Sequence, residues 1–172
     1  MSQIERNEFG HTMLRVVGLN LTGKEEAKRL HEAGYDVDDR AWACLTNQRS
    51  DGYDGRHRLA DGQPCKVALM PHSLINRDEE RTSAALYKIA TDRFGYQLIP
   101  AGAMPRVCET MSIENMRAMG APFIAGQHLH LKHLGTPYAL VIDIKNNKVV
   151  MTAVCVGNAA WQNEGVSAFL SL

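Results

Sequence analysis

The chain has 172 residues and a mass of 19.1 kDa, and its 19 Lys and Arg residues balance 19 Asp and Glu residues. This length predicts a single globular domain over residues 1–172, with enough chain to bury a core without disulfides or metals. The zero net charge argues against bulk binding to nucleic acid, because such binding needs an excess of cations to neutralise phosphates.

The sequence also argues against a membrane protein. No run approaches the roughly 18 apolar residues of a membrane span, and Glu5, Arg6 and Glu8 stand where a signal peptide needs an apolar stretch. The four cysteines lie far apart with no C-x-x-C pair, which favours reduced thiols packed in a core. We therefore expect a cytoplasmic protein that does not associate with a membrane.

The start of the chain predicts a strand followed by a helix. The run 13–21 is rich in Val and Leu, as strands are. Thr22 and Glu25 then have the spacing of a capping box, in which a hydroxyl and a carboxylate bind free amides at a helix start. We expect this helix to end at Gly34, which suits a C-terminal cap.

The most polar stretch follows a short apolar run, 41–45, which we expect to be buried. Residues 46–66 predict a long polar loop or a hairpin inserted into the domain. The stretch contains three Asp-Gly steps, each typical of a turn because glycine tolerates positive φ. Long polar loops in compact domains are often functional, so residues 46–66 are the first candidate for a binding surface.

The middle of the chain predicts two helices and two short strands. One helix starts after Asn76, presents apolar residues at helical spacing and ends at Gly95. The other helix is capped by Ser112 and closed by Gly120. The remaining segments are a buried strand at 67–70, a strand at 96–99 and a loop at 101–105.

The last third predicts antiparallel strands at 123–134, 138–144 and 149–156. Asn146 and Asn147 lie between the last two and suit a type I′ turn, and Asn158 is expected to cap a last short helix. Alternating elements followed by an antiparallel meander predict an α/β (α+β) fold, with a mixed sheet of about six strands and three to four helices.

The densest group of reactive side chains is His128, His130 and His133, three of the seven histidines. On a strand, His128 and His130 share a face, where they are able to bind a divalent metal or divide acid and base roles. His133 joins them as a metal ligand only if the chain turns near Lys132. The alternative is a solvated strand face, so no cofactor is assigned beyond this candidate divalent metal.

The segment from His128 to Gly135 resembles one half of the paired motif of two-histidine phosphoesterases. In that family a His-x-Thr or His-x-Ser pair on each of two strands acts on a phosphodiester, so the resemblance implies a phosphodiester-directed hydrolase. His130 stands in place of the hydroxyl, and the chain contains no second pair of this kind. No family is assigned on this resemblance.

Two further side chains are candidates for catalysis. Cys108 precedes a predicted helix and the histidines follow it, an order that suits a cysteine hydrolase; the alternative is a core thiol. Asp143 lies on a strand expected to neighbour the histidines, where a carboxylate orients an imidazole.

Residues 46–66 supply the candidate binding side chains. Cations and an aromatic ring alternate there with aspartates, so the stretch is close to neutral and does not resemble a nucleic-acid arm. A protein partner or a small-molecule ligand fits this composition, and a solvated loop is the alternative. The candidate binding residues are Arg49, Tyr53, Arg56, His57 and Arg58.

Two functions therefore stay open. The first is a small soluble binding or regulatory protein with no complete catalytic motif, which predicts an exposed apolar or aromatic patch. The alternative is a small hydrolase, phosphodiesterase-like or metal-assisted, that uses His128 and His130. It needs both imidazoles in a concave pocket beside a carboxylate, another histidine or a metal.

Overall fold

Nine strands form one mixed sheet in this computed structural model, which describes residues 5–157 and 160–172. The strand order is β1-β2-β4-β9-β5-β7-β8-β3, and β6 pairs with β7 beside this path. Neighbours are antiparallel except for β3 with β8 and β5 with β9. The strands are β1 (Glu5–Arg6), β2 (Thr12–Val17), β3 (Asp36–Val37), β4 (Pro64–Pro71), β5 (Phe123–Gly126), β6 (Leu131–His133), β7 (Thr136–Lys145), β8 (Lys148–Cys155) and β9 (Val166–Leu170).

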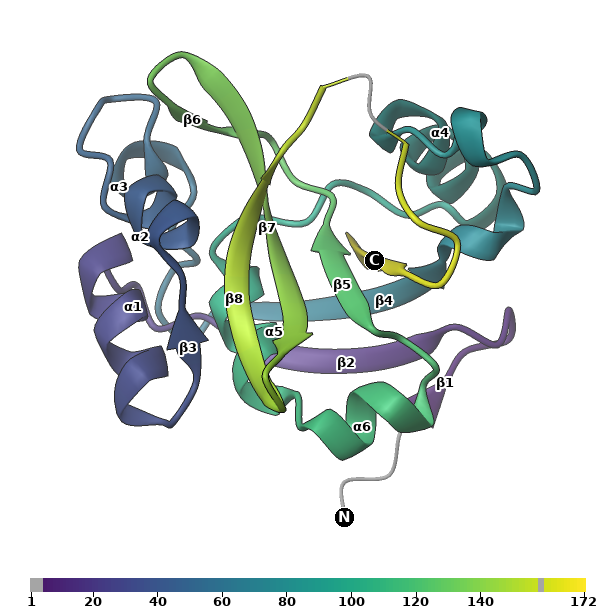
Figure 1. The fold of residues 1–172 in the computed structure, drawn as a ribbon, viewed down its shortest axis with the longest axis horizontal. Helices are drawn as coiled ribbons and strands as arrows, with labels where there is room; N and C mark the ends of the chain where they lie inside the picture. The colour runs from purple at the N-terminus through teal and green to yellow at the C-terminus, as the bar shows by residue number, and fades with distance from the viewer. Residues whose placement is uncertain (1–4, 158–159) are drawn as a thin grey trace.

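The sheet is strongly twisted, so that β2 and β4 cross behind β7 and β8 (Figure 1). One group of helices, α1 to α3, lies on one side of the molecule, and α4 lies on the opposite side (Figure 1). The described helices are α1 (Gly23–Glu32), α2 (Asp39–Leu45), α3 (Tyr53–Arg56), α4 (Ser83–Phe94), α5 (Ala103–Thr110) and α6 (Ile113–Ala118). Within the described residues, no helix has the length and apolar character needed to cross a membrane.

The core consists of two hydrophobic clusters on opposite faces of the sheet's central strands. The larger cluster surrounds α5, whose residues 103–108 are all buried and which packs against α1, β2, β7 and β8. The smaller cluster includes Met70 of β4, Phe169 of β9 and Leu86 of α4. The predicted mixed α/β class is confirmed, although the sheet has nine strands rather than about six.

The local signals at Thr22, Gly95 and Asn146-Asn147 are confirmed by backbone hydrogen bonds and positive φ. The Thr22 hydroxyl accepts the amide of Glu25, whose carboxylate accepts the amide of Thr22, as a capping box requires. Gly95 closes α4 in the left-handed region at φ 69°. Asn146 and Asn147 both have positive φ, at 50° and 57°, and join β7 to β8 by the predicted tight turn.

Three segments differ from the sequence-based expectation in the helices that they form. The run 41–45 belongs to α2, whose N-terminal cap is the side chain of Asp38. Residues 101–105 lead into α5 rather than forming a loop, because Pro105 lies in the first turn, where a helix needs no donor N–H. The helix expected after Asn76 starts only at Ser83.

The strand predictions also need correction. Residues 96–99 form one isolated bridge rather than a strand. The predicted strand 123–134 is divided into β5 and β6, with 127–130 between them. Strand β9 was not predicted, yet it lies between β4 and β5 in the sheet. Asn158, the expected cap of a last short helix, falls outside the described residues, but residues 160–165 contain no helix and lead into β9, so that prediction was wrong.

Residues 46–66 are more ordered than a long loop or a hairpin, because they contain α3 and the start of β4. Of the three Asp-Gly steps, Gly62 has the positive φ, 68°, expected of a turn. Gly52 has a different role, since a Cβ there would lie 2.2 Å from the carbonyl oxygen of Asn47. Close packing of the backbone at Gly52 against the backbone at Asn47 therefore explains why a glycine is needed at this position.

Candidate functional site

The His128 ring is a structural crosslink. It is buried, with 3% of its surface exposed. Its Nε2 accepts the amide of Leu140 on β7 at 3.0 Å, which requires Nδ1 to carry the proton that it donates to the carbonyl oxygen of Leu129 at 2.7 Å. Loss of solvent lowers the pKa of His128 to about 4. The neutral ring therefore uses both nitrogens to hold the segment after β5 against β7.

The other two predicted metal ligands do not join it. His130 is exposed and borders a cavity of about 230 Å³ together with Tyr87, Leu129 and His128. His133 lies on β6 and faces a separate groove. Among the described residues, no three His, Cys, Asp or Glu side chains are placed to hold a metal ion. The expected trio is dispersed because the chain leaves the sheet between β5 and β6.

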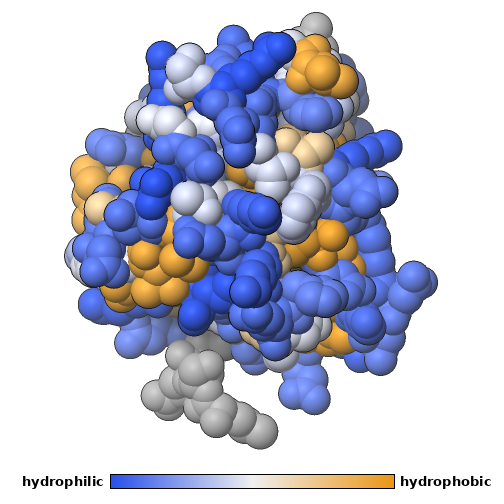
Figure 2. Space-filling view, turned by 90° about the vertical axis from the view of Figure 1, so that its left-hand side faces the viewer, coloured by the Kyte–Doolittle hydropathy of each residue, from blue (hydrophilic) through white to orange (hydrophobic). Residues whose placement is uncertain are grey.

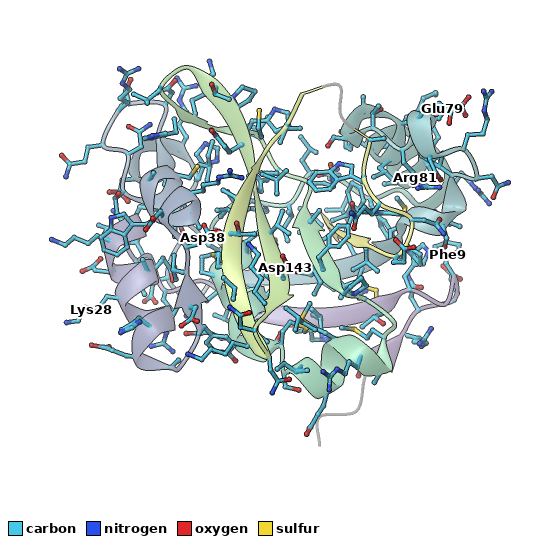
Figure 3. The ribbon with its side chains drawn as sticks, in the orientation of Figure 1. Phe9, Lys28, Asp38, Glu79, Arg81 and Asp143 are labelled. Atoms are coloured by element: carbon cyan, nitrogen blue, oxygen red, sulfur yellow. The ribbon has the colours of Figure 1, made fainter. Side chains whose placement is uncertain are left out.

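Cys108 and Asp143 are also apart from the histidines. Cys108 lies within α5, where burial raises the pKa of its thiol to about 12 and keeps it protonated at neutral pH. Asp143 lies on β7 near Asp38 (Figure 3), and Lys145 Nζ lies 3.5 Å from an Asp38 oxygen and 3.8 Å from an Asp143 oxygen. No hydrogen bond of the described residues joins either candidate to a histidine.

The predicted binding residues of 46–66 divide into core and surface. Tyr53 is 0% exposed and packs in the larger cluster, so it does not offer a face on which a partner could stack. His57 is also buried, with its ring centroid 6.5 Å from that of His128. Arg58 donates to the carbonyl oxygen of Asn20. Arg49 and Arg56 remain exposed.

The side chains of His72, Gln127 and Ser167 form a buried polar cluster that was not predicted from the sequence. The Ser167 hydroxyl lies 2.8 Å from His72 Nε2 and accepts Gln127 Nε2 at 2.9 Å, while His72 Nδ1 lies 2.9 Å from the carbonyl oxygen of Gln162. A hydroxyl beside an imidazole is the pair that serine nucleophiles need, but all three side chains are buried. They tie the end of β4 to β5 and β9. Because they are distant in sequence, no local pattern connects them.

A groove of about 540 Å³ joins two stretches that the sequence marks separately. One wall is α2 and the turn after it, with Trp42, Asn47 and Arg49; the other is the β6–β7 turn, with His133 and Leu134. The groove therefore brings the first residues of 46–66 beside one of the predicted histidines. Figure 2 shows the side of the molecule formed by α1 to α3, where hydrophobic patches interrupt a mostly hydrophilic surface.

A hydrogen bond from the Asn47 side chain joins the two walls. Asn47 Nδ2 donates to the carbonyl oxygen of Lys132 on β6, and Asn47 Oδ1 accepts the amide of Arg49 at 3.2 Å. The close approach of Gly52 to the Asn47 carbonyl supports the same turn from behind. The position of Arg49 is thus set by backbone and amide contacts rather than by its own guanidinium.

The groove presents side chains that lack intramolecular partners. Trp42 is 44% exposed and Leu134 is 83% exposed. Within 5–157 and 160–172, the Arg49 guanidinium and the His133 ring make no hydrogen bond or ion pair, and no Asp or Glu lines the groove. The site can therefore offer apolar contact and positive charge together.

Trp42 and Leu134 were not among the predicted residues. Trp42 belongs to the apolar run 41–45, every residue of which we expected from the sequence to be buried. As a helix, the run buries Ala41, Cys44 and Leu45 and turns Trp42 outward. Comparisons with protein-family models, with curated proteins and with solved structures found no match for this chain.

Proposed function

We propose that this protein is a binding or regulatory protein that acts through the groove between α2 and the β6–β7 turn. The observation that carries the proposal is that the exposed indole of Trp42 and the Arg49 guanidinium line the same wall of the groove. The backbone of this wall is held by the hydrogen bond between the Asn47 side chain and the Arg49 amide. Trp and Arg are the side chains that most often dominate binding energy at interfaces.

Preorganisation supports the same proposal. A binding turn whose backbone is already held in place loses less conformational entropy when a ligand arrives. Asn47 supplies this order, because it binds both the Arg49 amide and the carbonyl of Lys132 across the groove. The two walls therefore belong to one built surface rather than to two unrelated loops.

The hydrolase alternative has less geometric support. A general base at His128 needs a free ring nitrogen, whereas both nitrogens bind backbone groups and burial lowers its pKa to about 4. His130 borders the neighbouring cavity, whose lining includes Gln127 and Tyr87 but no carboxylate. Hydrolysis there would require His128 to give up its contacts.

A fragment screen followed by two-dimensional amide NMR tests the proposed function against this alternative. We expect fragment-induced shifts to concentrate on residues 42–49 and 131–134, and Trp42→Ala to abolish them. Phe9→Ala is the matched control, since Phe9 is 45% exposed and lies on the opposite side from α1 and its Lys28 (Figure 3). Shifts that concentrate on 127–130, or that survive Trp42→Ala, would contradict the proposal.

A further inference from the structure

We infer that the partner of this groove is a protein segment that presents an apolar side chain next to one or more carboxylates. The inference rests on the proposed function and names the chemistry of the partner. It follows from the exposure of the walls, the charge of the lining and the contrast with another cavity of the same molecule.

The exposure of the walls favours a protein segment over a small molecule. Small-molecule sites bury most of the ligand, commonly 70–90% of its surface. Here Leu134 is 83% exposed and Trp42 is 44% exposed, so the walls are too open to enclose a small ligand on their own. A protein segment brings further surface that covers both side chains and removes them from water at once.

The charge of the lining favours carboxylates. Arg49 supplies a positive charge to the lining of the groove, and the His133 ring lines it from β6. Lining residues of the opposite sign are absent from the described groove. A planar guanidinium binds a carboxylate through two parallel hydrogen bonds, which adds direction as well as attraction. Side-chain amides, such as that of exposed Gln48, extend the set of donors.

The apolar part of the partner follows from Trp42 and Leu134. The Trp42 indole offers a flat face, and the Leu134 side chain lines the same groove from the β6–β7 turn. An apolar side chain inserted between them would shield both from water, which is the usual anchor of a protein interface. The carboxylate must then lie within reach of Arg49, a few ångströms along the same segment.

A second cavity with a tryptophan and an arginine differs from the groove in its charge. This cavity of about 490 Å³, next to the chain just before α4, is also lined by a tryptophan, Trp161, and an arginine, Arg81. There Arg81 is already bound to Asp78 and to backbone carbonyls, and Glu79 and Glu164 add negative charge. An acidic segment would be repelled from that cavity and attracted to the groove.

A displayed library of random peptides, selected on the whole protein, tests the inference. Bound peptides are counter-selected on Trp42→Ala and the enriched peptides are synthesised for affinity measurement by fluorescence anisotropy. We expect groove-dependent peptides to carry Asp or Glu within a few positions of Leu, Ile, Phe or Trp. Arg49→Ala should weaken their binding about tenfold, and raising salt from about 50 to 500 mM should weaken it several-fold.

Arg117→Ala is the control, because Arg117 is an exposed arginine of α6 with no ion pair among the described residues. Arg49→Glu is a second test variant. Because its charge is reversed, it should no longer bind acidic peptides, while its circular dichroism spectrum should match that of the unsubstituted protein. Groove-dependent peptides without acidic residues, or an Arg49→Ala effect no larger than that of Arg117→Ala, would overturn the inference and leave the proposed function standing. A library with no Trp42-dependent binder would overturn both.

Discussion

His128 and His133 lie five positions apart, and the molecule uses them in opposite ways. Around His128, the chain between β5 and β6 is closed against β7 and both ring nitrogens bind backbone groups. Around His133, the chain has turned outward into a hairpin, and the ring lines an open groove. The two regions differ in the partners already available to the imidazole rather than in residue type.

His128 therefore stabilises the fold, whereas His133 has ring nitrogens that are available to a ligand. A polar group inside a protein must find partners, and once it has found them it has little left to offer a ligand. An exposed group without partners keeps its capacity. The comparison therefore directs attention from His128, which the sequence emphasises, to the surface that includes His133 and Arg49.

Acid gives the largest test of the buried region. The pKa values of His72 and His128 are lowered from 6.5 to about 4 in the folded protein, chiefly by burial. Above pH 6.5 both rings are neutral in the folded and unfolded chains. Between pH 6.5 and 4 the unfolded chain binds the protons, so stability falls by up to about 3 kcal/mol for each ring.

Glu26 opposes part of this loss. Burial raises its pKa from 4.5 to about 6 despite the neighbouring Arg106, so protonation between pH 6 and 4.5 returns up to about 2 kcal/mol. Urea unfolding at pH 7 and at pH 4.5 measures the balance, and we expect a net loss at the lower pH. Equal midpoints at the two pH values would show that the histidines are not buried and neutral.

Replacing each histidine gives the next largest contrast. His128→Ala removes two hydrogen bonds, leaves the Leu140 amide without its acceptor and opens a cavity, so we expect a loss of about 3 kcal/mol. His133→Ala should change the free energy of unfolding by less than about 0.5 kcal/mol, as surface substitutions do. Denaturant titrations compare them directly. Similar losses for both variants would erase the distinction between the regions.

Gly52→Ala sharpens the account of the groove. A Cβ at this position meets the carbonyl oxygen of Asn47 at 2.2 Å, so the turn must shift and we expect a cost of about 2 kcal/mol. Gly157→Ala is the control, since nothing lies within 4 Å of its Cβ. Thermal unfolding ranks the two variants. An unchanged Gly52→Ala protein would mean that the turn adapts freely and is not preorganised.

Asn47→Ala should affect stability less than Gly52→Ala does, by about 1 kcal/mol, because the lost bond to the Lys132 carbonyl is exposed. Its effect on groove ligands should be larger, with several-fold weaker binding. Asn115→Ala is the control, since that side chain also donates to a backbone carbonyl, that of Thr110, and does not line the groove. Unchanged affinity in Asn47→Ala would show that the two walls act independently.

Elements with local chemical signals were predictable from the sequence. The capping box at Thr22 and the Ser112 cap depend on side chains within three residues of the amides that they bind, and both are present. The Asn146-Asn147 turn is equally local. Helix α5 was missed because the proline in its first turn looks like a loop signal, and β9 because its burial depends on β4 and β5.

The candidate site was only partly predictable for the same reason. The sequence singled out residues 46–66 and the histidine segment as candidate sites. Both segments contribute side chains to the lining of the groove. The roles of Tyr53 and His128 were not predictable, because their burial depends on contacts with distant strands and helices. Trp42 needed the α2 helix to be recognised before its outward position could be seen.

The position of β9 has a consequence for how the protein is made. This strand comes last in the described fold, yet it pairs antiparallel with β4 on one side and parallel with β5 on the other. Until it emerges from the ribosome, the two halves of the sheet would each show a bare inner edge, a surface prone to join the wrong partner. We therefore expect the sheet to close only after these few residues have been synthesised.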